Sequence, residues 1–132
     1  MSSDLSILIH SSHNNIEEFA QEISKILSIT LVRKIQDGEV FYEYESPSEW
    51  MRLWINDFEN DMGIPFESYD FVLLLSAWGI NGKGYEESSF QFAKRIFENL
   101  KQSENYDLLL VRDVQEVLMR HDIIPIGKDG RE

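Results

Sequence analysis

Three histidines and many carboxylates are the side chains in this sequence that could most readily do chemistry. His10 and His13 lie three residues apart, and His121 lies far along the chain. A metal site would need these imidazoles to converge with a carboxylate, and nothing in their spacing requires it. The sequence has no cysteine, which excludes disulfides and thiolate metal sites. We therefore predict no metal site, no cofactor and no catalytic residue.

An acidic run in the middle of the chain resembles part of a calcium loop. Asp57, Glu59 and Asp61 alternate like the first ligands of such a loop. The loop also needs glycine at its sixth position and glutamate at its twelfth. Met62 and Ser68 occupy these positions here. We interpret the run as a solvated acidic surface.

The glycine-rich stretch 79–84 follows an apolar segment and precedes a predicted helix, where α/β proteins often bind phosphate. A phosphate loop would continue from Lys83 with serine or threonine, whereas Gly84 follows. Glu86 and Glu87 already complement the dipole of the helix and would repel a phosphate. The stretch is therefore predicted to be an exposed loop, of the kind that often carries contacts.

Charge is the most informative bulk property of the sequence. There are 24 acidic and 12 basic side chains, which give a net charge of −12. Such a chain repels nucleic acid and anionic membranes and attracts basic partners, although the charge could also serve solubility alone. Aromatic anchors ringed by acid make good protein-binding patches. We predict a partner-binding surface made of acidic and aromatic side chains, namely Asp57, Glu59, Asp61, Glu67, Asp70, Trp78, Tyr85, Glu86 and Glu87.

The first part of the chain predicts a strand, a helix and a hairpin. Residues 5–10 are apolar and branched, as in a strand, and Asn14 with Glu17 predicts the start of a helix that ends near residue 28. Asp37-Gly38 is a preferred turn for a hairpin between strands 29–36 and 39–45.

The next segment carries another helix-start pattern. A serine cap, a proline and a glutamate in 46–49 predict a helix through Trp50, Leu53 and Trp54 that ends at Gly63. This spacing would turn both tryptophans toward the core. The alternative for the segment is a further strand before an acidic loop.

The last part of the chain predicts a strand at 71–76, a helix at 86–102, a strand at 108–111 and a short helix around 114–118. The unit from 71 to 111 should be a right-handed parallel crossover. We predict one α/β (α+β) domain over residues 1–132, with a frayed tail at 127–132. Its mixed five-stranded sheet would pack with three to four helices, in the order β-α-β-β-α-β-α-β-α.

Two segments of the sequence carry a family resemblance. They are residues 59–70, which contain Gly63-Ile64-Pro65-Phe66, and residues 15–19 after the first strand. Together they resemble small acidic immunity proteins of bacterial polymorphic or contact-dependent growth-inhibition toxin systems, over about the first two thirds of the chain. The resemblance implies a cytoplasmic protein that binds a cognate toxin domain and blocks it, with acid occupying a basic cleft in place of nucleic acid.

Other functions remain open from the sequence. The leading hypothesis is a non-catalytic inhibitor of a basic protein partner, with no nucleic acid or membrane as its target. The second is a small hydrolase that uses His10, Asp70 or Asp107 at strand ends. The third is a regulatory domain that binds a ligand beside Lys83 or dimerises. No signal peptide or membrane-spanning run is evident at the start of the chain, which predicts a cytoplasmic protein.

Overall fold

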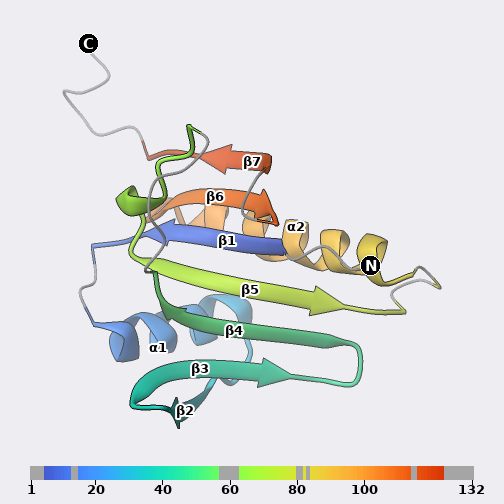
Figure 1. The fold of residues 1–132 in the computed structure, drawn as a ribbon, viewed down its shortest axis with the longest axis horizontal. Helices are drawn as coiled ribbons and strands as arrows, with labels where there is room; N and C mark the ends of the chain where they lie inside the picture. Colours follow the sequence, from blue (N-terminus) through green and yellow to red (C-terminus); the bar gives the residue numbers. More distant parts are fainter. Residues whose placement is uncertain are drawn as a thin grey trace.

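The computed structural model describes residues 5–12, 15–56, 63–79, 82, 84–113 and 116–123. These residues form the strands β1 (Leu5–His10), β2 (Val32–Gln36), β3 (Glu39–Glu45), β4 (Glu49–Ile55), β5 (Phe71–Ala77), β6 (Asp107–Arg112) and β7 (Glu116–His121). The helices that they form are α1 (Ile16–Leu27), α2 (Tyr85–Ser103) and the short 3₁₀ helix η1 (Phe66–Ser68). All seven strands join one sheet in the order β2-β3-β4-β5-β1-β6-β7, and every neighbouring pair is antiparallel (Figure 1).

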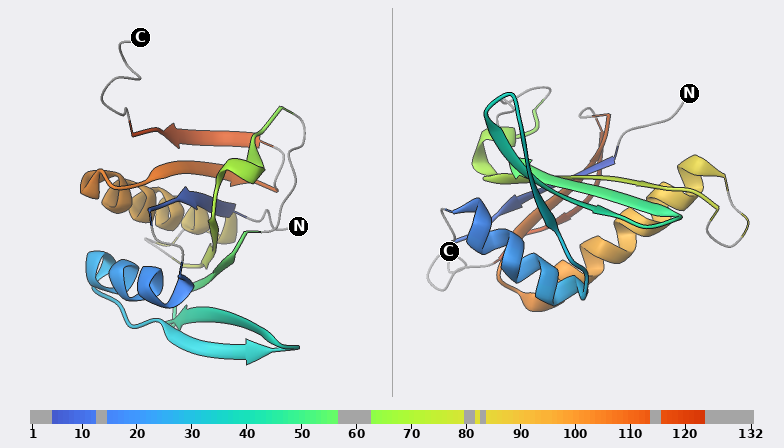
Figure 2. Two further views of the ribbon diagram at one scale, coloured as in Figure 1. Left: turned by 90° about the vertical axis from the view of Figure 1, so that its left-hand side faces the viewer. Right: turned by 90° about the horizontal axis from the view of Figure 1, so that it is seen from below.

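Both long helices pack on the same face of the sheet (Figure 2). Alternate residues of the central strands point to this face, as the two-residue period of a strand requires. The ring of Phe19 on α1 stacks on Phe71 of β5 at 4.3 Å between centroids, and Tyr106 meets Phe19 edge-on at 5.6 Å. The core on this side therefore joins α1 and α2 to the middle of the sheet.

The opposite face of the sheet is covered by the segment 63–69 over β5, β1 and β6. Ile64, Phe66 and Tyr69 of this segment form a second buried cluster with one residue from β1, one from β5 and two from β6. Asn56 fixes the segment, because its side-chain amide donates to the carbonyl oxygens of Phe66 and Tyr69, each at 2.8 Å. This half of the sheet is consequently buried on both faces.

Several predicted elements are confirmed. The strand at 5–10, the helix over 16–27 and the hairpin around Asp37-Gly38 are all present. Asp37 and Gly38 both have positive φ, 54° and 82°, as the predicted turn requires. The N-cap of α1 is Asn15 rather than the predicted Asn14, and its Oδ1 accepts from the backbone N–H groups of Glu17 and Glu18. Asn14 itself lies outside the described residues.

The predicted fold class is wrong. The sheet has seven strands rather than five, it is wholly antiparallel rather than mixed, and two α-helices lie among the described residues rather than three or four. The predicted helix after residue 46 is strand β4, and the predicted helix around 114–118 gives way to strand β7. The further strand that was the alternative for the first of these segments is the correct one.

The residues of the helix-start pattern before β4 make the hydrogen bond of a helix cap, although a strand follows instead of a helix. Ser46 Oγ accepts from the backbone N–H of Glu49 at 3.1 Å, as a helix cap would. However, the backbone N–H of Ser46 donates to the Glu49 carbonyl at 2.8 Å, which closes a turn between β3 and β4. Pairing of the following residues with strands on both sides then outweighs the helical spacing.

The strands β5 and β6 run in the same direction, as predicted, but they do not pair. Strand β1 lies between them and is antiparallel to both. The acidic run 57–62, which forms the last part of the predicted helix after residue 46, and the predicted frayed tail at 127–132 lie outside the described residues. No helix among the residues described has the length and apolar content to cross a membrane.

Candidate functional site

The most distinctive surface lies on the half of the sheet that segment 63–69 does not cover. Directly opposed residues of an antiparallel pair share a face. Glu43 is opposite Arg52, and Glu45 is opposite Trp50, whereas Tyr42 and Leu53 form a buried pair on the helix side. We call the surface the β3–β4 face. Its residues are Lys34 from β2, Glu39, Phe41, Glu43 and Glu45 from β3, and Trp50, Arg52 and Trp54 from β4.

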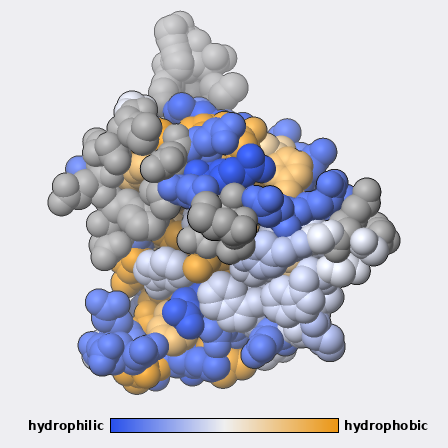
Figure 3. Space-filling view, turned by 45° about the vertical axis from the view of Figure 1, so that its right-hand side comes forward, coloured by the Kyte–Doolittle hydropathy of each residue, from blue (hydrophilic) through white to orange (hydrophobic). Residues whose placement is uncertain are grey.

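Two rows of unlike side chains lie next to each other on the β3–β4 face. The row on β3 carries three carboxylates and one phenylalanine, and the row on β4 carries two tryptophans with an arginine between them. Neither α1 nor α2 covers this side of the sheet (Figure 1, Figure 2). Figure 3 shows side chains of intermediate hydropathy next to hydrophilic ones on the front of the molecule. The pairing of β3 with β4 places acidic and aromatic side chains together on this side of the sheet.

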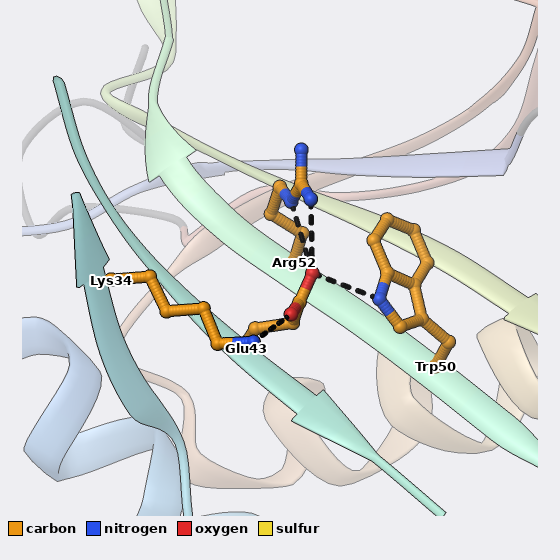
Figure 4. Close-up of polar contacts among 4 residues, drawn as sticks. All are labelled: Lys34, Glu43, Trp50 and Arg52. Atoms are coloured by element: carbon orange, nitrogen blue, oxygen red, sulfur yellow. Dashed lines mark hydrogen bonds and ion pairs between the residues drawn. The ribbon is translucent and has the colours of Figure 1, made fainter. Parts of the chain in front are cut away.

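Glu43 is the centre of the polar contacts on this face (Figure 4). One carboxylate oxygen accepts from Lys34 Nζ at 2.6 Å. The other accepts from Trp50 Nε1 at 3.0 Å and from Arg52 Nη2 at 3.0 Å and Nε at 3.3 Å. The Glu43 side chain is only 11 % exposed. A carboxylate with this many donors holds three strands in one arrangement.

These contacts also exclude Glu43 from acid–base work. The hydrogen bond from Lys34 is the main reason that the pKa of Glu43 lies below its usual value, and Arg52 and Trp50 lower this pKa further. Partial burial opposes the shift without cancelling it. Glu43 is therefore held ionised, and its role is to order its neighbours rather than to exchange protons.

The guanidinium of Arg52 is held by rings as well as by charge. Its Cζ lies 4.4 Å from the ring centroid of Phe41 and 5.3 Å from that of Trp50. Cation–π contacts of this kind add about 0.5–1 kcal/mol at exposed sites. Together with the Glu43 contacts, they make the β3–β4 face a pre-ordered surface, which lowers the entropy cost of binding.

Two hollows flank the hairpin of β2 and β3. The first, of about 270 Å³, lies beside the turn and is lined by Gln36, Asp37, Glu39, Val40, Phe41, Arg52 and Trp54. The second, of about 590 Å³, lies toward the start of β2 and is lined by Ser28, Ile29, Thr30, Val32, Lys34, Glu43, Tyr44 and Glu45. Both hollows include residues of the β3–β4 face.

Four of the predicted site residues lie at the end of β5 and the start of α2. Trp78 follows β5, is 41 % exposed, and donates from its indole N–H to the Pro47 carbonyl at 2.8 Å. The hydroxyl of Tyr85 lies 2.9 Å from Ser76 Oγ, and Ser76 is directly opposite Trp50 on β4. Tyr85 thus joins this end of the molecule to the β3–β4 face. The remaining two, Glu86 and Glu87, are exposed in the first turn of α2.

The other predicted site residues do not join this group. Glu67 and Asp70 lie just before β5, so the length of that strand, roughly 20 Å, separates them from Trp78. Asp57, Glu59 and Asp61 lie outside the described residues. The predicted surface is therefore divided between the two ends of β5 instead of forming one patch.

The residues predicted for a hydrolase do partly converge. His10 Nδ1 lies 2.7 Å from Asp70 Oδ2, and the backbone N–H of Ser11 donates to the same oxygen at 3.1 Å. Asp107 is directly opposite His10, but its Oδ1 accepts from the backbone N–H of Ile123 at 2.6 Å. The His10 and Asp70 side chains are 51 % and 43 % exposed, and neither hollow includes them.

Sequence reasoning missed the β3–β4 face because it placed Trp50 and Trp54 on a helix. The signal was available in the alternation of Trp50, Arg52 and Trp54 with the buried Met51 and Leu53, which has the period of a strand. Comparison of the chain with protein-family models, curated proteins and solved structures gives no match. Among the described residues, no group of three or more histidine, aspartate or glutamate side chains could hold a metal ion. Lys83, the residue of the predicted ligand loop, lies outside the described residues.

Proposed function

We propose that this chain acts by binding a basic protein and neutralising it, as a cytoplasmic immunity protein does for its cognate toxin domain. The observation that carries the proposal is the β3–β4 face, where a row of acid on β3 lies beside a row of aromatic side chains on β4. The net charge of −12 supports the same conclusion, since it favours basic partners over nucleic acid or anionic membranes.

The two rows have different roles in this proposal. Glu39 and Glu45 are exposed carboxylates, and charges of this kind speed the encounter with an oppositely charged partner. Trp50 and Trp54 are partly buried, Trp50 with a hydrogen bond to Glu43 and Trp54 with packing against the second cluster, so a partner can cover the rest of each ring without first ordering the side chain. Tyr85 and Trp78 extend the aromatic area toward α2, with Glu86 and Glu87 at its rim.

The proposal is tested by co-expressing the chain with the product of the neighbouring open reading frame. Co-purification at low and moderate salt is then measured for the wild type and for Glu39→Lys with Glu45→Lys. We expect the wild type to capture one basic protein in a complex that salt weakens, and to relieve its toxicity. The double reversal should reduce capture by about tenfold or more, because it turns attraction into repulsion at the same surface.

A matched variant distinguishes an effect of this surface from an effect of the total charge. Glu86→Lys with Glu87→Lys changes the net charge by the same amount at the rim. This pair should slow association and reduce its salt dependence while leaving most of the affinity, as rim charges do. Equal losses in the two variants would show that only the total charge matters, and no capture by the wild type would contradict the proposed function.

A hydrolase is the second candidate, and the contact between His10 and Asp70 favours it. A carboxylate that holds Nδ1 of a histidine leaves Nε2 to act as a base toward a water molecule. Loss of a hydrolytic activity in His10→Gln, with capture of the basic partner unchanged, would support this candidate over the first.

A further inference from the structure

The smaller hollow beside the hairpin turn has walls and a rim of different chemistry. Phe41 and Trp54 provide aromatic walls, and Asp37 and Glu39 provide exposed carboxylates. Among the described residues, neither carboxylate forms an ion pair. Arg52 also lines the hollow and donates twice to Glu43, a carboxylate that it shares with Lys34. With two carboxylates and one guanidinium in its lining, the hollow carries a net negative charge.

The volume of this hollow restricts what can occupy it. At about 270 Å³ it lies below the range of roughly 300–1,000 Å³ that is typical of small-molecule sites, but it has room for one long side chain. An anion would be repelled by Asp37 and Glu39. A purely apolar side chain would remove water from both carboxylates without replacing it, which is unfavourable. A flat cation on an apolar stem can pack against the aromatic walls and pair with the carboxylates at the rim.

The protein already binds such a cation in this way at the wall of the same hollow, in the side chain of Arg52. The guanidinium of Arg52 lies over the Phe41 ring at 4.4 Å and donates twice to the Glu43 carboxylate. A second guanidinium in the hollow would have an aromatic ring in Trp54 and carboxylates in Asp37 and Glu39. Arginine suits both, because its planar group stacks on rings and donates to carboxylates with two parallel N–H groups.

We propose that the hollow lined by Phe41, Trp54, Asp37 and Glu39 is an anchor site for one arginine side chain of a basic protein partner. This assignment rests on the proposed function, since it names the residue type by which that partner is held. It makes Trp54 the ring that the arginine covers, and it makes Asp37 and Glu39 the acids that specify a cation.

The three tryptophans of the chain provide a direct readout. Each contributes one indole N–H signal to a ¹⁵N NMR spectrum, and only Trp54 lines the hollow. The Trp78 indole is bound to the Pro47 carbonyl, beyond the far end of β4, and serves as an internal reference. The probe is the tripeptide acetyl-Gly-Arg-Gly-amide, and the control probe has citrulline, which has nearly the same shape without the charge, in place of arginine.

We expect the arginine probe to shift the Trp54 signal in a saturable way while the Trp78 signal stays in place, and the citrulline probe to shift neither. Asp37→Asn with Glu39→Gln should weaken probe binding by about three- to tenfold. Asparagine tolerates the positive φ of position 37, so the turn should be preserved. Glu17→Gln with Glu18→Gln, in the first turn of α1, removes the same charge elsewhere and should leave probe binding unchanged.

Two results would overturn the assignment: shifts of Trp54 that are equal for arginine and citrulline, or equal weakening by the two neutralised pairs. A further test keeps this inference separate from the proposed function. If Asp37→Asn with Glu39→Gln captures the basic partner of the co-expression experiment as well as the wild type does, the anchor site is wrong and the proposed function stands. Reduced capture by this pair alone would support the anchor site.

Discussion

The two halves of the sheet differ in what covers them. In the half formed by β5, β1 and β6, side chains on both faces are buried, because the helices cover one face and segment 63–69 covers the other. In the half formed by β2, β3 and β4, the fully buried side chains lie on the helix side, and on the other face Trp54 packs partly buried against the second cluster. The first half can therefore supply most of the stability of the fold. The second leaves a structured surface available for a partner.

The largest expected effect comes from truncating a buried side chain of segment 63–69, which covers the first half of the sheet. Phe66 is 1 % exposed between the segment and the sheet, so Phe66→Ala should lower the free energy of unfolding by about 3–5 kcal/mol. Phe41→Ala is the matched change on the β3–β4 face, where the ring is partly exposed and the Arg52 guanidinium lies over it. We expect it to lower the free energy of unfolding by about 1 kcal/mol. Urea unfolding followed by tryptophan fluorescence measures both.

The ratio of these two losses tests the comparison directly. Similar losses would mean that the β3–β4 face is as much a part of the core as the covered half. In contrast, a small loss for Phe41→Ala, together with weaker capture of a partner, would assign that ring to binding rather than to folding.

A second prediction concerns pH and Glu43, the centre of the polar contacts on the β3–β4 face. Its folded-state pKa is lowered, chiefly by the hydrogen bond from Lys34, so its ionised contacts stabilise the fold above the pKa of the unfolded chain. That contribution is lost as pH falls below about 4.3 and through the folded-state pKa. At pH 7, Glu43→Gln should lower the free energy of unfolding by about 1 kcal/mol, since Lys34 is half-exposed and its ion pair is weakened by solvent.

The measurement is urea unfolding of the wild type and of Glu43→Gln from pH 7 down to pH 3. The difference between them should be constant from pH 7 to about pH 5.5 and shrink at lower pH. A difference that is independent of pH would mean that the ionised form of Glu43 contributes nothing to stability. Glu45→Gln is the control, because Glu45 is exposed on the same strand and should show almost no difference at any pH.

The comparison also explains which parts of the fold could be predicted from the sequence. Elements with one period and a clear local signal, such as α1 with its asparagine cap and the Asp37-Gly38 hairpin, were correct to within a few residues. The segment 49–55 fits two periods: Trp50, Leu53 and Trp54 have helical spacing, while Met51 and Leu53 alternate with polar or aromatic residues as in a strand. Only pairing with β3 and β5, which no local pattern reveals, decides between them.

The site was predictable to a lesser degree than the fold. An acidic and aromatic surface was expected, but the residues chosen for it lie at opposite ends of β5 or outside the described residues. The contact between His10 and Asp70 joins positions 60 residues apart. It exists because β1 lies beside β5, and strand order depends on which faces the helices and segment 63–69 bury. Charge and residue type therefore predicted a kind of surface, and the packing of the sheet decides where acidic and aromatic side chains gather.

The smallest expected effect lies at the edge of the covered half, where His10 and Asp70 meet in solvent. Both side chains are about half exposed, so solvent screens their contact and Asp70→Asn should change the free energy of unfolding by about 0–1 kcal/mol. Asparagine can still accept from the backbone N–H of Ser11, which limits the loss further. Unfolding in urea at low and high salt measures the change, and capture of the basic partner should be unaffected because this pair lies outside the β3–β4 face. A loss of capture as large as that of the Glu39 and Glu45 reversals would place the binding surface at this end of β5 and contradict its assignment to the uncovered half of the sheet.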